Sequence, residues 1–200
     1  MADYLARWIN PYLVNPDKPG LGEEMRSDFG RLLERHLAQG HGGPWGWKAP
    51  PSIFLLPFFA RVLPGMRFVH VLRDGRDIAF SRNQNQPRRY GAALLGPDAE
   101  LASPAGAIRL WTQANLTAAQ FGERELGERY LQIRFEDVCS DPQPVIARLL
   151  AFLELAGDPA ALAAEVQAPP TLGRWRQQDA ALVAELEEIA RPALERFGYL

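Results

Sequence analysis

Apolar residues recur at helical spacing early in the chain, where Glu23–Ala38 predicts an amphipathic helix. Its apolar positions are Met25, Phe29, Leu32, Leu33 and Leu37. The preceding stretch, Asn10–Gly22, is rich in Pro, Gly and Asn, and we interpret it as a loop. Trp45–Lys48 is interpreted as a short strand, and the longest apolar run, Ile53–Ala60, as a buried helix. This run is far too short to span a membrane, for which a helix needs about 20 residues.

Two segments rich in β-branched and aromatic residues, Arg67–Leu72 and Tyr130–Phe135, predict strands. The predicted helices run from the N-cap Asp74 to about Asn85, over Ala105–Leu126, from Asp141-Pro142 onward, and from about Asp179 with an interruption at Pro192. Such alternation is typical of an α/β fold with a parallel sheet. Because ligands on these sheets bind beyond the carboxyl ends of the strands, Arg73 and Glu136-Asp137 become candidate functional residues.

Composition narrows the classes of function. The 200 residues, 47% of them apolar, suffice for a sizeable core, and we expect residues 1–200 to form one domain. The formal net charge of −2 argues against a general polyanion binder, so no nucleic-acid partner is expected. Met1-Ala2-Asp3-Tyr4 does not begin a signal peptide, and Cys139 is the only cysteine, so no intrachain disulfide forms. We expect a cytoplasmic protein with no membrane partner.

The segment Val69–Ser81, VHVLRDGRDIAFS, carries the most informative chemistry. Arg73 stands where a strand ends, and Ser81 is expected about two turns into the following helix. A guanidinium and a hydroxyl placed in this way are able to hold one phosphate, and a helix N-terminus adds backbone donors. From spacing alone another interpretation stays open, in which Arg73 forms a salt bridge with Asp74 or Asp77 and the hydroxyl bonds back to a helical carbonyl.

The pattern strand-Arg-Asp-x-Arg-Asp-x-x-x-Ser resembles the 3′-phosphate-binding motif of sulfotransferases that use 3′-phosphoadenosine 5′-phosphosulfate (PAPS). Three further stretches are similar to this family in the same order: Trp45–Pro50, Arg134–Val138 followed by Asp141-Pro142, and Gly173–Arg176. The likeness covers roughly Trp45 to the C-terminus. The chain therefore resembles a bacterial-type sulfotransferase domain.

This resemblance implies roles for five residues. Arg73 and Ser81 match the positions that hold the 3′-phosphate, and Arg174 matches the basic element that closes over it; a solvated loop arginine is the alternative for Arg174. Phe135 matches an aromatic position near the adenosine that is usually Tyr. Lys48 matches a lysine that positions or neutralises the transferring sulfuryl group, whose loose transition state needs its charge stabilised. The alternative for Lys48 is a lysine that snorkels beside tryptophan.

Two departures from the family pattern affect the expected activity. Many members have a catalytic His two residues after the Lys, but here that position is Pro50, so the motif assigns no general base. His36 is expected on the surface and His70 in the core, and His41 is a minor candidate for the base. The glycine-containing loop that cradles the 5′-phosphosulfate in the family does not occur in Met1–Gly43. We therefore expect an N-terminally incomplete domain: a truncated product, a fragment, or a domain that has lost catalysis.

The resemblance implies a three-layer α/β sandwich with a central parallel sheet, of the P-loop nucleotide-hydrolase type, with the first strand–loop unit missing. It also implies transfer of a sulfuryl group from PAPS to a hydroxyl or amine, with release of 3′,5′-adenosine bisphosphate (PAP) and no need for a metal. The acceptor is expected to be a small molecule or glycan-like. Its pocket would be built largely from Asn10–Gly43 and Gln84–Ser103.

Two rival functions stay open at this point. The first is a degenerate, non-catalytic domain that binds PAP or a protein partner. The second is a different P-loop enzyme, such as a small-molecule kinase, which requires a Walker-type loop that the sequence lacks. Without its first strand the sheet is expected to have an open edge, which predicts marginal stability or association with a second copy or an upstream segment.

Overall fold

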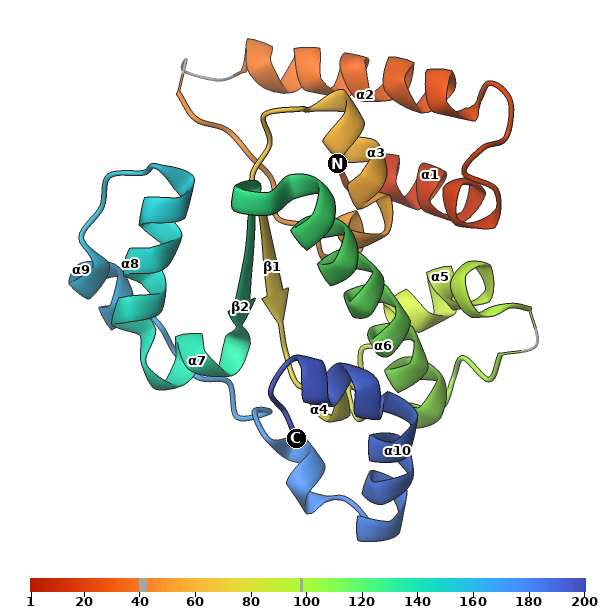
Figure 1. Cartoon of the computed structure of the whole chain (residues 1–200), viewed down its shortest axis with the longest axis vertical. Helices are drawn as coiled ribbons and strands as arrows, with labels where there is room; N and C mark the ends of the chain where they lie inside the picture. The colour runs from red at the N-terminus through yellow and green to blue at the C-terminus, as the bar shows by residue number, and fades with distance from the viewer. Residues whose placement is uncertain (40–42, 98) are drawn as a thin grey trace.

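Helices surround a small sheet in the computed structural model of the chain, which describes residues 1–39, 43–97 and 99–200 (Figure 1). The helices are α1 (Ala2–Val14), α2 (Leu21–Ala38), α3 (Leu56–Val62), α4 (Gly75–Ala79), α5 (Asn85–Leu95), α6 (Pro104–Phe121), α7 (Phe135–Ser140), α8 (Pro142–Leu153), α9 (Pro159–Ala164) and α10 (Ala180–Arg196). Shorter helical turns lie at Pro50–Leu55, Gly122–Leu126, Gly127–Arg129 and Arg174–Gln177. None of the described helices is long and apolar enough to cross a membrane.

Two parallel strands, β1 (Phe68–Leu72) and β2 (Tyr130–Arg134), form the sheet of the described chain. Phe68 lies opposite Tyr130, and the register continues without a bulge to the ends of both strands. Both strands lie where the sequence predicted them, to within one residue at either end. The predicted α/β fold with a parallel sheet is confirmed, whereas the three-layer sandwich of P-loop type stays a prediction.

One apolar cluster joins α1, α2 and α3. The buried side chains of α1 follow helical periodicity, at Tyr4, Leu5, Trp8, Ile9 and Tyr12. The Tyr4 hydroxyl donates to the carbonyl of Met25 in α2 at 3.0 Å, which ties the two helices together. The loop predicted over Asn10–Gly22 is therefore wrong in its extent, because α1 continues through Pro11 to Val14.

A second cluster packs α4 and α10 against α6. Gly75 permits the close approach of α4, because a Cβ at this position would lie 2.5 Å from the Trp111 ring of α6. The prediction that Pro192 interrupts the last helix is wrong, since α10 continues through it. Pro192 is exposed, so water can solvate the helical carbonyl that proline leaves without an N–H partner.

The segment predicted as a short strand, Trp45–Lys48, pairs with no strand in the described chain, so that prediction is wrong. Trp45 and Trp47 instead stack with their ring centroids 6.1 Å apart. Trp47 Nε1 donates to Ser52 Oγ at 2.9 Å, which fixes this ring against the helical turn that follows. A strand depends on a hydrogen-bonded neighbour, and a local sequence pattern does not reveal one.

The helix predicted from Asp74 to about Asn85 is shorter than expected. Its N-cap is confirmed, because the Asp74 carboxylate accepts from the backbone N–H of Arg76 at 2.9 Å. Helix α4 nevertheless ends at Ala79, and α5 begins at Asn85. The chain between them is irregular, and this changes the position of Ser81.

The two faces of the sheet are covered unequally. On one face His70 and Leu72 are buried. On the other face the Val71 side chain is 55% exposed, although Ile133 opposite it is buried. The apolar positions of α8, which lies beside β2, are at most half-buried. One face of the sheet therefore belongs to the core, and the other is partly open to solvent at β1.

Candidate functional site

Arg73 follows β1 directly, and its side chain reaches forward along α4. The guanidinium donates to Asp77 Oδ2 from Nη2 at 2.8 Å and from Nε at 3.3 Å. The same Nη2 contacts Thr171, with 2.5 Å to the carbonyl oxygen and 3.3 Å to the hydroxyl. The structure thus contains the salt bridge to Asp77 that was one of the two interpretations of this spacing.

Asp77 links the segment Thr171–Trp175 to α4 through hydrogen bonds. Its side chain is 1% exposed. Besides the Arg73 guanidinium, its carboxylate accepts from the backbone N–H of Gly173 at 2.8 Å and of Trp175 at 3.3 Å. Gly173 has a φ of 72°, in the left-handed region that favours glycine. One buried carboxylate therefore holds both the candidate phosphate-binding arginine and a loop 96 residues away in sequence.

Arg174 lies over the C-terminal end of α4. Its Nε donates to the Thr171 carbonyl at 3.1 Å, and its Nη1 donates to the Phe80 carbonyl at 3.5 Å. Because Arg73 also donates to the Thr171 carbonyl, two guanidinium groups converge on the same oxygen. Phe80 directly precedes Ser81, so this convergence lies beside the predicted hydroxyl. Within the described residues, Arg174 forms no salt bridge with an acidic side chain.

Ser81 is half-buried and lies just beyond α4. Its backbone N–H donates to the Ile78 carbonyl at 3.0 Å, and its hydroxyl oxygen accepts from the backbone N–H of Asn83 at 3.2 Å. The expectation that Ser81 lies two turns into the helix is wrong, because α4 stops two residues before it. In the described chain no hydrogen bond joins the side chains of Ser81 and Arg73.

The end of β2 contributes two side chains to the same edge of the sheet. The Arg73 Cζ lies 5.5 Å from the ring centroid of Phe135, within the range of a cation–π contact. The Glu136 carboxylate accepts from the backbone N–H of Asp74 at 2.9 Å and from the Tyr199 hydroxyl at 2.9 Å. The residues that follow the two strands therefore meet at the carboxyl edge, as parallel pairing requires.

Arg76 locks α4 to the C-terminal part of the chain. Its guanidinium is almost fully buried, pairs with Asp74 at 2.8 Å and Glu187 at 2.5 Å, and lies 3.8 Å from the centroid of the Trp175 ring. Burial by itself lowers the pKa of Arg76, but the hydrogen bonds and charges of Asp74 and Glu187 outweigh it and raise the pKa above its usual value. Arg76 therefore stays charged and serves as an anchor.

Lys48 lies apart from this cluster. It is exposed, and no hydrogen bond or salt bridge joins it to Arg73, Ser81 or Arg174 in the described chain. Of the candidate bases, His36 is exposed, as predicted, and lies edge-on to a tryptophan ring. His41 lies outside the described residues.

His70 is a satisfied core histidine, as predicted. Its side chain is buried, with Nδ1 2.7 Å from the Tyr130 hydroxyl and Nε2 2.9 Å from Asn115 Oδ1. Since the amide oxygen only accepts, Nε2 carries the proton and Nδ1 accepts from the hydroxyl. Burial lowers the pKa of His70, which keeps the ring neutral.

A model of the sulfotransferase family matches residues 6–159, more than half of the chain. The chain belongs to the sulfotransferase family. No curated protein and no solved structure matches it. The matched residues include Lys48, Arg73, Ser81 and Phe135, whereas Arg174 lies beyond them. The match also covers α1 and α2, which the motif resemblance did not reach.

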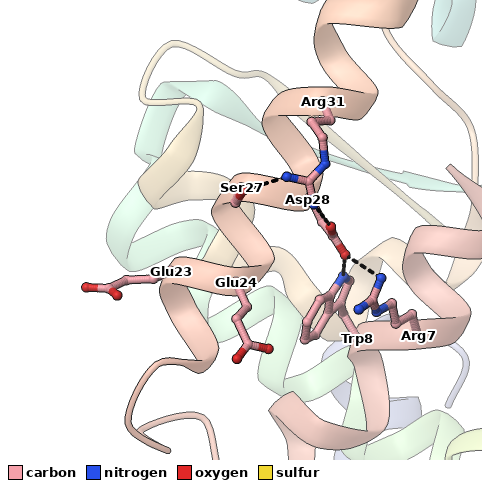
Figure 2. A pocket seen from close by; sticks show the side chains of 7 residues that line it. All are labelled: Arg7, Trp8, Glu23, Glu24, Ser27, Asp28 and Arg31. Atoms are coloured by element: carbon pink, nitrogen blue, oxygen red, sulfur yellow. Dashed lines mark hydrogen bonds and ion pairs between the residues drawn. The ribbon is translucent and has the colours of Figure 1, made fainter.

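A pocket for a substrate of this family would be expected near the Arg73 cluster, at the carboxyl edge of the sheet. A hollow of about 400 Å³ lies between α1 and α2, and Figure 2 shows the side chains that line it. In it Asp28 accepts from Trp8 Nε1 at 3.0 Å, pairs with Arg7 at 2.9 Å, and also pairs with Arg31. Figure 1 shows α1 and α2 toward the N-terminal end of the strands, whereas α4 lies at the carboxyl end. This hollow is therefore not part of the cluster around Arg73.

Reasoning from sequence missed the long-range contacts that hold the site together. Thr171 and Tyr199 were not singled out, and although Asp77 and Glu136 were named, their bonds to Gly173 and to Tyr199 were not expected. The spacing of Arg73 and Asp77, four residues apart at the start of a helix, was the one local signal of this network. The bridges to Thr171 and Tyr199 had none, because they depend on tertiary contacts.

Proposed function

We propose that this member of the sulfotransferase family binds PAPS at the carboxyl edge of the sheet and transfers its sulfuryl group to a hydroxyl or amine. The observation that carries the proposal is the convergence of the Arg73 and Arg174 guanidinium groups on the Thr171 carbonyl, beside the Ser81 segment. Asp77 compensates one of these two guanidinium charges, and the remaining positive charge at Arg174 favours a phosphate.

The charges around the two arginines favour an anion at Arg174. Arg73 is neutralised by the buried Asp77, whereas Arg174 donates only to carbonyl oxygens in the described chain. A 3′-phosphate that accepts from Arg174 and the Ser81 hydroxyl would replace these weaker neutral partners. Arg73 would add a contact without leaving Asp77, because a guanidinium has five N–H donors.

The remaining residues of the proposal supply orientation and charge. Phe135 lies against Arg73 and offers an aromatic face for adenine, since bases stack on aromatic side chains. Lys48 would neutralise negative charge on the sulfuryl group once donor and acceptor are both bound and the sulfuryl group lies beside it. When bound, PAPS supplies the activated sulfuryl group. The residues of this chain bind and orient the donor and stabilise negative charge.

The residues around Arg174 suit the 3′-phosphate of PAPS. A 5′-phosphosulfate would need backbone donors at the N-terminus of a helix that follows a glycine, and α2 is the helix to consider. Helix α2 begins after Gly20, and its first turn carries Glu23 and Glu24. Two carboxylates at a helix N-terminus repel an anion. Figure 1 also shows α2 at the far end of the strands from α4. We therefore derive no contact to the 5′-phosphosulfate.

A second function, a non-catalytic domain that binds PAP, is favoured by one observation. Lys48, the residue proposed to act on the sulfuryl group, makes no contact with the Arg73 cluster in the described chain. In that case the 3′-phosphate half would retain its affinity for PAP while no transfer takes place. Binding of PAP is expected for both functions, so only a measurement of sulfuryl transfer distinguishes them.

The test is sulfuryl transfer from radiolabelled PAPS to a panel of alcohol, phenol, amine and glycan acceptors. The chain offers a matched pair of variants, because Lys48 and Lys18 are its only lysines. We expect Lys48→Ala to lower the turnover rate by roughly 10²-fold or more, as loss of one charge-stabilising group does elsewhere, and Lys18→Ala to leave it unchanged. No transfer by a folded chain that binds PAP would instead establish the non-catalytic function.

A further inference from the structure

In the part of the chain that the structure describes, the outer edge of β1 has no partner strand. A strand directs the N–H and C=O groups of alternate residues to its two sides, and β2 takes those on one side. Within the described residues, no backbone or side-chain hydrogen bond reaches the other groups of Phe68–Leu72. The Val71 side chain, at 55% exposed, leaves the neighbouring sheet face open as well.

At the opposite edge of the sheet, the chain itself contacts β2. Arg148 in α8 donates from Nη2 to the carbonyl of Gln132 in β2 at 2.6 Å. Figure 1 shows α8 beside β2, on the side away from β1. The contrast matters because folded proteins usually cover or charge a strand edge that has no partner. In the described chain, an arginine contacts the β2 edge, and no hydrogen bond reaches the outer edge of β1 beside the exposed valine.

We propose that the β1 edge pairs with the β1 edge of a second copy of this chain. A two-fold axis through His70 would place Val69 of one copy opposite Val71 of the other, and Phe68 opposite Leu72. Val69 and Val71 then meet as an apolar pair on the open face of the sheet, while His70, on the axis, and Leu72 stay buried in the core of each copy, so the exposed face of FVHVL is complementary to itself in antiparallel register. The two sheets become one mixed sheet of four strands, which is more stable than an isolated pair.

The charges at the ends of β1 permit this pairing. In the proposed register Arg67 of one copy approaches Arg73 of the other, and two free arginines would repel each other. Each of them is already paired within its own chain, Arg67 with Glu154 and Arg73 with Asp77. The edge therefore carries no uncompensated charge, whereas a strand edge kept monomeric commonly carries a free lysine.

The experiment is sedimentation equilibrium of the full chain from low to high micromolar concentration. The variants are Val71→Lys, which adds a charge at the proposed interface, and Val71→Thr, which keeps a β-branched residue there. Val14→Lys is the matched control, because Val14 is an exposed valine, 72% exposed, in α1. We expect a reversible dimer in the wild type, with a dissociation constant raised at least tenfold by Val71→Lys and changed less than threefold by Val71→Thr and Val14→Lys.

A wild-type monomer throughout the range would overturn the proposal, and so would a dimer whose dissociation constant Val71→Lys leaves unchanged. If Val71→Lys does not fold, hydrogen exchange of the wild-type peptide that contains β1 decides the matter. Slower exchange at high protein concentration supports pairing at this edge, and exchange independent of concentration contradicts it. Neither measurement depends on PAPS, so the outcome stands apart from the proposed transferase function.

Discussion

Replacing Asp77 with alanine removes the acceptor that joins α4 to the segment Thr171–Trp175. In the structure this carboxylate is 1% exposed and accepts from the Arg73 guanidinium and from the backbone N–H groups of Gly173 and Trp175. Without it, the hydrogen bonds left to Arg73 in the described chain are those to Thr171, and two backbone donors lose their partner.

The size of the effect follows from burial and charge. Removing one partner of a buried ion pair costs about 3–5 kcal/mol, because the remaining charge is left without compensation. The Arg73 side chain is 18% exposed, so partial hydration offsets some of this cost, and we expect a loss of about 3–4 kcal/mol in the free energy of unfolding. For a domain of this size, that corresponds to a fall of roughly 6–16 °C in the melting temperature.

Urea unfolding and calorimetry of the variant measure this loss. Asp77→Asn separates its causes, because the amide oxygen still accepts from a backbone N–H but carries no charge; we expect it to recover part of the stability. Asp158→Ala is the control, since Asp158 caps α9 at the surface and its loss costs about 1 kcal/mol. If Asp77→Ala is no more destabilising than Asp158→Ala, the Asp77 carboxylate does not hold the Thr171–Trp175 segment to α4.

Two further predictions concern the core. Gly75→Ala should destabilise the chain by about 1–3 kcal/mol in urea unfolding, because the new Cβ would meet the Trp111 ring at 2.5 Å; an unchanged midpoint would show that the contact relaxes freely. Burial lowers the pKa of His70 from its usual 6.5, so the unfolded state binds more protons below that pH and the free energy of unfolding falls as the pH drops below about 6.5. In His70→Gln, whose amide can still bond to Tyr130 and Asn115, this part of the pH dependence should disappear, and a pH profile identical to that of the wild type would contradict the assignment.

The sequence predicted the elements whose signals are local. The two strands were found because β-branched and aromatic residues gather in them, and the N-cap Asp74 because its side chain bonds within two residues. The sequence of α1 contains two conflicting local features. The apolar positions from Tyr4 to Tyr12 have helical spacing, whereas Pro11 and the nearby turn residues favour a loop. Tertiary packing outweighed the local preference.

The candidate site was predictable in part for the same reason. The position of Arg73 at the strand end and the meeting of Phe135 with it follow from parallel pairing, which the alternation of elements indicated. The hydrogen bond from Gly173 to Asp77 could not be predicted, because the two residues are 96 apart in sequence. No spacing rule connects residues at that separation.

The most direct test of the proposed function is calorimetric titration of the chain with PAP and, separately, with 5′-AMP, which lacks the 3′-phosphate. We predict that PAP binds at least tenfold more tightly, since charge-assisted hydrogen bonds contribute about 1.5–3 kcal/mol each. Arg73→Ala and Arg174→Ala should remove most of that preference, whereas Arg124→Ala, at an exposed arginine that pairs with its neighbour Glu125, should keep it. Equal affinity for the two nucleotides, or a preference that survives both substitutions, would contradict a 3′-phosphate site at the end of β1.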